Sequence, residues 1–590
     1  MKINDYYTQE LYNLRTLGKK FSERNPGLSS FLSEKGQDPD VERLLEGFAF
    51  LTGKLHENMD KEFPELTHGL TQLMWSNYLQ PIPSYTIVSF TPERESILKN
   101  IVPKDTKLLA YSDASNIECP FLTNYEVELH PLELSKVDYF TNGYTSTIAL
   151  DLSVTSGGVL DNLDLDKLRF YLGGSEFVSQ ELHLYLHRYV TDIEVEVLDD
   201  NNSNRTFLLE KNVIKSVGFS ENENMLPKHQ NVFHAYILMQ EYFCYRDKFN
   251  FIDIEGLEKL KNINSTILKK SKTFRLSIHF DRHLTISEDL KLENFRLFCT
   301  PAVNIVETES VPLRKTNKDE EYEIIPADLK LEDTEVFMIK EVNGWSEEDN
   351  SYEKFLPFGS FEHARSNQEF YWQKVKLTED EKRLRTFIRF APNTLEHASF
   401  LDKNMVVSIS LLATNKNIPS KLSLGAVNQL HSSAKISNIE VENITIPSKS
   451  YLPPLEGDFL WRLISNMSLN YLSLGNIITF RTLIEAYDFP GIGDAMQHRK
   501  TQSILQGLDK ISYKRSEMIY KGLPIRGIET IIELNPDRYA SLGEAYIFSN
   551  VLNDFLTLYC NLNTFHRLEV KVDRHETFSW DARLGQQSLM

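Results

Sequence analysis

Apolar side chains recur at helical spacing in two segments at the start of the chain. In the first they stand 4, 3 and 7 residues apart, the spacing of a heptad seam: Tyr7, Leu11, Leu14 and Phe21. The second segment starts with Asp38 as N-cap and Pro39 at the first helical position. It should end before Pro64, because the residue before a proline is pushed out of the α region. Its apolar side chains form one stripe: Val41, Leu44, Leu45, Phe48, Leu51, Leu55 and Met59.

Neither helix within residues 1–80 can form a core alone, because each has a single apolar face. Both therefore need something to pack against. Two possibilities stay open from the pattern alone. The stripes pack on later parts of the same chain, or they pack on another protein.

The pattern changes after the Pro81-Ile82-Pro83 break, which is rigid and extended. From about residue 85 to 446, short runs alternate apolar and polar residues between Gly, Pro, Asn and Asp, which is typical of β-strands. Residues 182–187 alternate leucine with His183, Tyr185 and His187, and residues 274–280 alternate in the same way. A helical island is expected near residues 230–244.

Three prolines in residues 447–457 indicate a linker, and the residues beyond it show both helical and strand patterns. We expect a helix-rich piece at 459–487, strands near 511–520, 527–534 and 566–572, and one more helix between them. That helix carries a stripe, which we expect to pack on the C-terminal sheet: Ile547, Val551, Phe555, Leu558 and Leu562. The fold class is therefore α+β and multidomain. The predicted domains are a helical arm (1–80), a β-rich domain (81–330), a second β-rich domain (331–450) and a mixed domain (451–590).

Composition narrows the function classes. The 590 residues carry a formal net charge of −20, which disfavours coating a nucleic acid, although contact with a basic patch on a protein stays possible. The four cysteines form no CxxC pair, so neither a zinc ribbon nor a disulfide scaffold is expected. Residues 459–480 are the most membrane-like, but an arginine and several asparagines interrupt them. With no apolar signal core at the start, we expect a cytoplasmic protein without membrane insertion.

Candidate catalytic motifs are weak. Residues 47–55 resemble a phosphate loop but have five residues between the glycines, Leu55 where Ser or Thr binds magnesium, and a predicted helix around them. Gly491-Ile492-Gly493 is interpreted as a turn. His183 and His187 are four residues apart, as are His279 and His283, but on strands that spacing spans roughly 13 Å, too far for one zinc.

Other chemistry-bearing residues favour structural roles. Cys299 stands in an apolar strand context and is interpreted as a buried thiol. The adjacent pairs Glu320-Glu321 and Glu347-Glu348 lie in expected loops. Adjacent carboxylates on a loop do not flank a single glycosidic bond, as the two carboxylates of a glycosidase must. No cofactor or metal site is expected.

Groups of residues that keep their order along nearly the whole chain carry a further signal. Residues 1–304 contain Tyr6-Tyr7-x-x-Glu10-Leu11-x-x-Leu14-Arg15, Asp38-Pro39-Asp40-Val41-Glu42-Arg43-Leu44-Leu45-Glu46-Gly47-Phe48, Pro64-Glu65, Gln240-Glu241-Tyr242-Phe243, and Cys299-x-Pro301-x-Val303-Asn304. The rest of the chain contains Trp461-Arg462, Asn470-Tyr471, Arg526-Gly527-x-Glu529 and Asn563-Thr564-Phe565. Together they resemble the TssF family, a baseplate subunit of the bacterial type VI secretion system. One departure is Ala413 and Lys416, where the family often carries Cys and Arg.

The resemblance implies a structural wedge component, similar to wedge proteins of contractile phage baseplates, that supports sheath and tube assembly. It implies two TssF copies with one TssG, a helical core bundle with TssG, attachment of TssK, a link through TssE, and contacts with the VgrG spike hub and neighbouring TssF copies. The location implied is the cytoplasmic face of the inner membrane. The bundle residues would be Tyr7, Leu11, Leu14, Phe21, Val41, Leu44, Leu45, Phe48, Leu51 and Leu55, with Asp38, Glu42, Arg43 and Glu46 at the helix start.

A hypothesis from another class is a β-rich carbohydrate-binding protein or glycoside hydrolase. The feature that separates the two hypotheses is the helical arm, which a hydrolase does not need.

Overall fold

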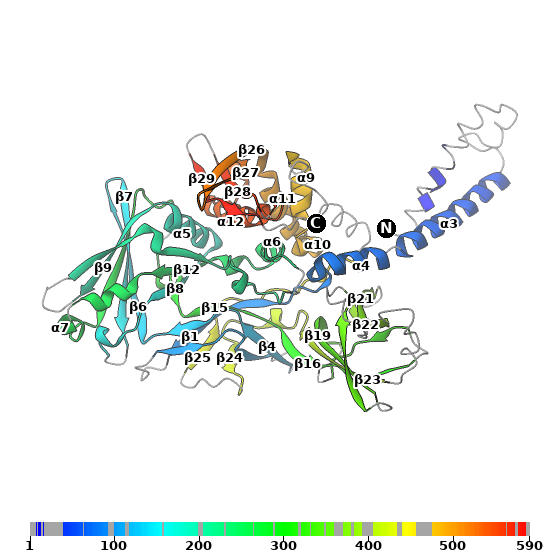
Figure 1. Cartoon of the computed structure of the whole chain (residues 1–590), viewed down its shortest axis with the longest axis horizontal. Coiled ribbons are helices and arrows are strands. Elements are labelled where there is room, and N and C mark those ends of the chain that lie inside the picture. Colours follow the sequence, from blue (N-terminus) through cyan, green and yellow to red (C-terminus); the bar gives the residue numbers. More distant parts are fainter. Residues whose placement is uncertain are drawn as a thin grey trace. The chain divides into compact units, whose positions relative to one another are not determined.

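A computed structural model describes most of the chain, and Figure 1 labels its elements. The described residues are 7–8, 10–12, 14, 16, 39–62, 64–92, 99–112, 117–155, 158–198, 205–228, 232–263, 265–286, 289–316, 320–327, 329–330, 332–346, 350–358, 370–378, 383–391, 405–432, 439–455, 475–561, 563–572 and 576–585. The chain divides into two compact units, residues 1–73 with 454–467, and residues 74–453 with 468–590.

The described residues of the smaller unit lie mostly in helices. α3 (Pro39–Glu62) begins at the proline that the sequence marks as the first helical position. α4 (Pro64–Trp75) begins at the next proline, so the chain breaks its helix where the sequence predicts. The described residues between 7 and 16 are helical as well. Both N-terminal helices are therefore confirmed where the structure describes them.

A six-stranded antiparallel sheet lies at the centre of the larger unit, and it joins parts of the chain that are far apart in sequence. Its order is β24 (Val427–Leu430), β3 (Lys107–Ser112), β4 (Ile117–Thr123), β15 (Cys299–Val303), β1 (Tyr85–Pro92) and β25 (Ile439–Asn443). β1 pairs with β15 on one side and with β25 on the other, Val88 standing opposite both Thr300 and Asn443. β2 (Asn100–Val102) and β5 (Val127–Leu129) form a separate two-stranded sheet.

Two further sheets and the helices α5 (Glu176–Arg188), α6 (His234–Cys244) and α7 (Ser265–Leu268) complete the first β-rich region. One sheet has the order β10 (Arg205–Glu210), β9 (Val190–Leu198), β13 (Thr273–Phe280), β7 (Thr145–Val154) and β6 (Leu132–Asn142). The other has the order β11 (Ile214–Val217), β12 (Phe251–Glu255), β8 (Lys167–Tyr171) and β14 (Arg296–Leu297). β13 and α6 confirm the strand expected at 274–280 and the helical island.

The strand expected at residues 182–187 is wrong, because these residues belong to α5. The helix is buried all round from Val178 to Leu186, so the alternation of leucine with other residues does not mark two different faces. Its start is marked locally, since the Ser175 hydroxyl accepts a hydrogen bond from the Val178 N–H.

An eight-stranded sheet forms the second β-rich region. Its order is β16 (Val306–Glu309), β23 (Met405–Thr414), β19 (Glu335–Ser346), β20 (Ser351–Pro357), β21 (Phe370–Thr378), β22 (Arg383–Ala391) and β18 (Tyr322–Glu323), with β17 (Leu313–Lys315) also on β23. Alternate residues of β23 contribute to its core, and Val407, Ile409 and Leu411 are fully buried there.

The C-terminal region is mixed, as expected. α9 (Ile477–Glu485), α10 (Phe489–Gly493), α11 (Ala495–Gln506) and α12 (Leu542–Thr557) gather around a sheet of β26 (Leu508–Tyr520), β27 (Leu523–Leu534), β28 (Phe565–Lys571), β29 (Thr577–Ser579) and β30 (Arg583–Leu584) (Figure 1). Gly491 to Gly493 form the end of the short helix α10 and not the turn that we expected, because the Asp488 carboxylate caps it through the Gly491 N–H.

α12 contacts β28, as its apolar stripe predicts, and it also contacts α5 and α6. Val551 and Phe555 are fully buried there, while Leu562 lies outside the described residues. The α+β multidomain class is confirmed. The four domain boundaries drawn from the sequence stay a prediction.

Candidate protein-interaction site

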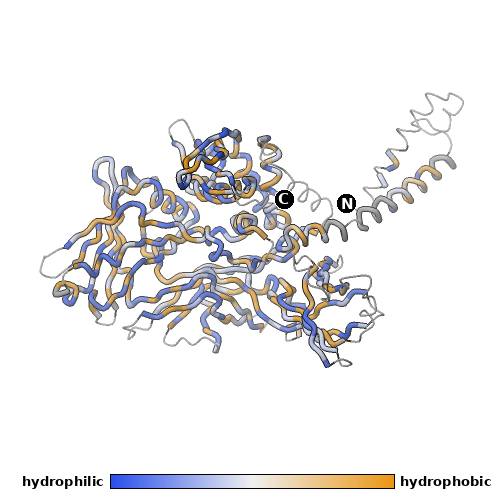
Figure 2. The backbone as a smooth tube through the Cα atoms, viewed as in Figure 1, coloured by the Kyte–Doolittle hydropathy of each residue, from blue (hydrophilic) through white to orange (hydrophobic). Residues whose placement is uncertain are grey.

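One face of α3 presents large apolar side chains to solvent. Leu44 is 73% exposed, Phe48 59% and Leu51 62%. At about 100° per residue, the three lie within about 60° of one another around the helix. Ala49 and Gly53, on the opposite side, are buried. α3 therefore buries small residues and exposes large ones, and the apolar positions recur along it in Figure 2.

The other predicted bundle residues are placed only in part. Tyr7, Leu11, Leu14 and Leu45 are half-buried on helices, and Arg43 and Glu46 are exposed on α3. The structure gives helical backbone, but no description of the side chain, for Pro39, Val41, Glu42, Leu55, Pro64 and Glu65. Phe21, Asp38, Trp461, Asn470 and Tyr471 lie outside the described residues, as do Glu347 and Glu348.

Glu241 of the family motif forms a fully buried ion pair. Its carboxylate accepts a hydrogen bond from Lys248, and both side chains are completely buried. The other carboxylate oxygen accepts from the backbone N–H of Met225 at 2.7 Å and of Leu226 at 2.8 Å. Each charge is therefore compensated, which a buried charge requires. Glu241 ties α6 to the loop before it and is not free for catalysis.

Tyr242, its neighbour, belongs to a cluster of aromatic rings. Its ring stacks on Phe548 of α12, with centroids 5.2 Å apart, and the Arg246 guanidinium lies 5.6 Å from its centroid. Burial raises the pKa of Tyr242 strongly. The residue therefore packs α6 against α12.

Cys299 and Asn304, at the two ends of one motif, are both buried. The burial expected for the Cys299 thiol is confirmed, and this burial raises its pKa to about 12. The Asn304 amide donates to the Pro120 carbonyl at 2.7 Å, and its oxygen accepts from the Asn415 N–H at 2.8 Å. Asn304 thus joins the six-stranded sheet to the end of β23.

The last two motifs meet across parallel strands. Gly527 of β27 stands opposite Phe565 of β28. A Cβ on Gly527 would lie 2.3 Å from the Phe565 carbonyl oxygen, so no larger residue fits. Arg526 beside it is exposed and pairs with Glu517 at 3.2 Å, and Asn563 is exposed in a turn.

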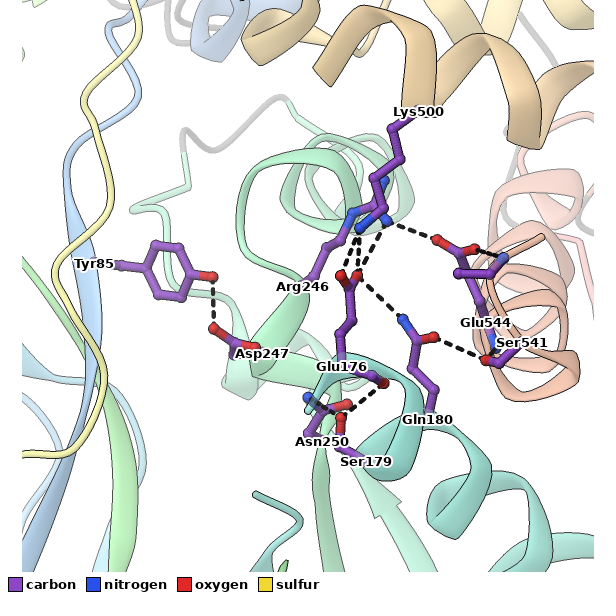
Figure 3. Close-up of polar contacts among 11 residues, drawn as sticks. Tyr85, Glu176, Ser179, Gln180, Arg246, Asp247, Asn250, Lys500, Ser541 and Glu544 are labelled. Carbon is purple, nitrogen blue, oxygen red and sulfur yellow. Dashed lines mark hydrogen bonds and ion pairs between the residues drawn. The ribbon is translucent and has the colours of Figure 1, made fainter. Parts of the chain in front are cut away.

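A polar network that sequence reasoning missed joins α5 to the C-terminal helices (Figure 3). Lys500 of α11 donates to both oxygens of Glu176, at 2.6 and 2.7 Å. Arg246 contacts Glu176 at 3.4 Å and Glu544 of α12 at 2.7 Å. Burial would raise the pKa of Glu176, but Lys500 and Arg246 outweigh it and lower that pKa.

The network extends through uncharged groups. The Ser541 hydroxyl donates to Gln180 at 2.9 Å, and Gln180 donates to Glu176 at 3.3 Å (Figure 3). A separate pair joins the Tyr85 hydroxyl, as donor, to the Asp247 carboxyl at 3.1 Å. Burial raises the pKa of the Asp247 carboxyl. The pattern Ser541-x-x-Glu544 matches a capping box, so the sequence could have indicated that a helix starts here. It could not have indicated which residues Ser541 and Glu544 contact. The network holds the C-terminal region to α5.

The histidines of both pairs make ring or hydrogen-bond contacts within the fold. His183 and His187 lie on α5 and not on a strand, and their rings stack with centroids 4.3 Å apart. Burial lowers the pKa of His187 to about 4, and its ring contacts the Ser216 hydroxyl at 2.7 Å. His279 contacts the Thr147 hydroxyl at 2.9 Å. Among the described residues, no group of three or more His, Cys, Asp or Glu side chains could hold a metal.

One of the two adjacent acidic pairs lies among the described residues. Glu321 pairs with Lys374 and Lys376, and Glu320 pairs with Arg389, so both carboxylates serve ion pairs of the second β-rich region. Within the described part of the chain, no helix is long and apolar enough to cross a membrane.

Comparison with known proteins gives consistent results. The family model described as "Type VI secretion system, TssF" matches residues 1–587. The Type VI secretion system component TssF1 of Pseudomonas aeruginosa is 26% identical over 638 aligned positions, covering 99% of each chain.

Two solved structures share the fold. One, of a type VI secretion TssK–TssF–TssG baseplate subcomplex, contains a chain with a TM-score of 0.73 and 24% identity over 92% of this chain and all of that one. The other, of the baseplate complex from the type VI secretion system, gives a TM-score of 0.61 and 22% identity over both full chains. The match of one family model to nearly every residue shows that this chain belongs to the TssF family of the type VI secretion system.

Proposed function

We propose that this chain is a structural wedge subunit of a type VI secretion baseplate, and that α3 is the arm by which it joins its neighbours. The observation that carries the proposal is the exposed stripe Leu44, Phe48 and Leu51. Exposed apolar side chains gathered on one face mark a protein-interaction site more often than a solvated surface.

The stripe is large enough to stabilise an assembly. Fully burying a large apolar side chain contributes about 1.5–3 kcal/mol, and these three are roughly two-thirds exposed. A partner that covers them would gain about 1–2 kcal/mol from each, or about 3–6 kcal/mol in all. A helical bundle supplies such a cover, because a second helix with its own stripe can interlock with this one.

TssG is the proposed partner of the arm. The solved subcomplex combines a TssF chain with TssK and TssG, which supports a wedge of the same kind here. We extend the proposal to two copies of this chain for each TssG, to TssE as the link to the sheath, and to contacts with the VgrG spike hub and with neighbouring TssF copies. The place of action is then the cytoplasmic face of the inner membrane.

We propose no enzymatic activity. The carboxylates that line one cavity of about 340 Å³, Glu126, Glu128 and Glu223, offer a test of the hydrolase alternative. Glu128 pairs with Lys99 at 2.6 Å, and Glu223 accepts from the Gly218 N–H at 2.8 Å. Two of the three are thus engaged in holding the fold, which favours the structural role.

The test is co-expression of the full chain with the TssG encoded beside it, followed by affinity purification and size exclusion. Leu44→Asp combined with Leu51→Asp should abolish the complex, because it removes two stripe side chains and places two charges in the interface. The β-rich region should keep its thermal transition.

A matched control lies on the same helix. Phe50 is 48% exposed but lies about 120° from Leu44, outside the stripe. Phe50→Asp should therefore leave the complex intact. A complex that survives the stripe variant, or a wild-type chain that never binds TssG, would contradict the proposal.

A further inference from the structure

β26 is the outermost strand of the C-terminal sheet, so in the described part of the chain only one of its two edges pairs with another strand. Its 13 residues pair with β27 from Leu508 to Tyr520, and the register shifts only at the start, between Leu508 and Lys510. A long, regular edge strand presents a row of backbone N–H and C=O groups with which another strand can pair. The outer edge of residues 513–519, here called the β26 edge, is therefore a candidate interaction surface.

The turn that follows β26 shows which residues of the β26 edge direct their backbone groups outward. Lys521 and Gly522 form a two-residue turn with φ of 48° and 81°, as the central residues of a type I′ turn do. Such a turn makes the residues that flank it, Tyr520 and Leu523, a hydrogen-bonded pair, and hydrogen-bonded pairs alternate along an antiparallel ladder. Counted back from Tyr520, the odd-numbered residues of the β26 edge therefore direct their N–H and C=O groups away from β27.

The charges along the β26 edge complement those of a second copy in one register. When a two-fold axis relates two identical antiparallel strands, one residue stands opposite itself and its two neighbours stand opposite each other. With Ser516 on the axis, Arg515 of each copy stands opposite Glu517 of the other. With Arg515 or Glu517 on the axis, like charges stand directly opposite each other, which is destabilising. The charges therefore select the register that is centred on Ser516.

The same register covers an apolar side chain that this chain leaves in water. Ile519 is 78% exposed. Because successive residues of a strand point to opposite faces, Ile519 lies on the same face as Tyr513 and the buried Ile511. In the register centred on Ser516, Ile519 of each copy stands opposite Tyr513 of the other. The pairing therefore continues the apolar face of one sheet onto the next and removes Ile519 from solvent, which is favourable.

We propose that the β26 edge pairs with the β26 edge of a second copy of this chain, as antiparallel strands centred on Ser516. The pairing joins two C-terminal sheets into one, with an Arg515–Glu517 pair on each side of the axis. The proposal rests on the proposed function for its setting, because a baseplate brings copies of this chain together. That setting matters, since two short strands bury less area than a stable free dimer needs, and a high local concentration compensates for this.

Cysteine substitution tests the register, in concentrated samples of the full chain, alone and with its TssG. Ser516 stands opposite itself in a pair without backbone hydrogen bonds, where the Cα atoms are about 4.5 Å apart and a disulfide can form. Ser516→Cys should therefore give a disulfide-linked homodimer on mild oxidation, and the four native cysteines, all buried, should not. Lys514→Cys is the control, because it points to the same face but stands opposite Met518 of the other copy. Lys514→Cys with Met518→Cys should crosslink again.

A charge exchange tests whether the occupant is a second copy. In the Ser516→Cys chain, Arg515→Glu should lower the crosslink yield at least about fivefold, because it sets like charges opposite each other on both sides of the axis. Glu517→Arg should do the same, and its exposed pair with Arg526, at 3.2 Å, contributes little to the fold. Arg515→Glu combined with Glu517→Arg makes the strands complementary again and should restore the yield. A different protein on the β26 edge would not tolerate this exchange.

The outcomes separate the two proposals. The pairing of the β26 edge is overturned if Ser516→Cys stays monomeric, if Lys514→Cys alone crosslinks as readily, or if the charge exchange does not restore the yield. None of these results affects the binding of TssG by the arm. If the chain never binds TssG but Ser516→Cys still crosslinks in the concentrated chain alone, the proposed function fails and the pairing stands.

Discussion

The buried pair of Glu241 and Lys248 gives a quantitative test of how α6 is held. Lys248→Met keeps the length and the packing of the side chain but removes its charge. Glu241 then keeps two backbone hydrogen bonds and loses its only described cation, in a site that is completely buried. Breaking a buried ion pair from one side costs about 3–5 kcal/mol.

The assay is hydrogen–deuterium exchange of the α6 segment, because a local measurement avoids the multistate unfolding of a large chain. A cost of about 3–5 kcal/mol should lower the protection of residues 234–244 by at least about a hundredfold. The exposed pair of Lys354 and Glu341 serves as control, and Lys354→Met should change local stability by less than about 1 kcal/mol.

A double variant separates charge from packing. Glu241→Gln with Lys248→Met keeps an acceptor for the Met225 and Leu226 N–H groups but leaves no buried charge. It should therefore be more stable than Lys248→Met alone. Protection of α6 that changes by less than threefold in Lys248→Met, or a double variant as unstable as the single one, would refute the reasoning.

Two more substitutions test buried groups elsewhere. Burial raises the pKa of Glu335 to about 7, above its ordinary value of 4.5. This carboxyl therefore leaves stability unchanged below about pH 4.5, destabilises the fold increasingly between pH 4.5 and 7, and reaches its full cost above pH 7. Glu335→Gln should stabilise the second β-rich region by about 3 kcal/mol at pH 8 and not at pH 4.5, and thermal melts without that pH dependence would contradict it. A Cβ on Gly543 would lie 2.0 Å from the Gln180 carbonyl oxygen, so Gly543→Ala should lower the melting temperature by separating α12 from α5. An increase, as expected from helix propensity alone, would show that this contact is loose.

Elements with local signals could be predicted from the sequence. Pro39 and Pro64 mark helix starts by themselves, and the alternation in β13 matches one buried face. α5 could not be recognised from alternation, because a helix buried on all sides carries no polar face to set its period. Its signal was Ser175, an N-cap that requires no knowledge of the surroundings.

Contacts between distant residues could not be predicted, even where the residues that make them were recognised. The motifs around Gly527 and Phe565 were recognised separately, and only the parallel register places one against the other. Lys500, Glu176 and Glu544 come from three helices whose packing no local pattern encodes. The exposed stripe of α3 was predictable, because amphipathic spacing depends only on the helix itself.

The most direct test of the central claim is a cryo-EM map of this chain in complex with its TssG. The account predicts that α3 packs against TssG helices and that Leu44, Phe48 and Leu51 become buried in that contact. A map in which TssG binds elsewhere, with the three side chains still exposed to solvent, would contradict it.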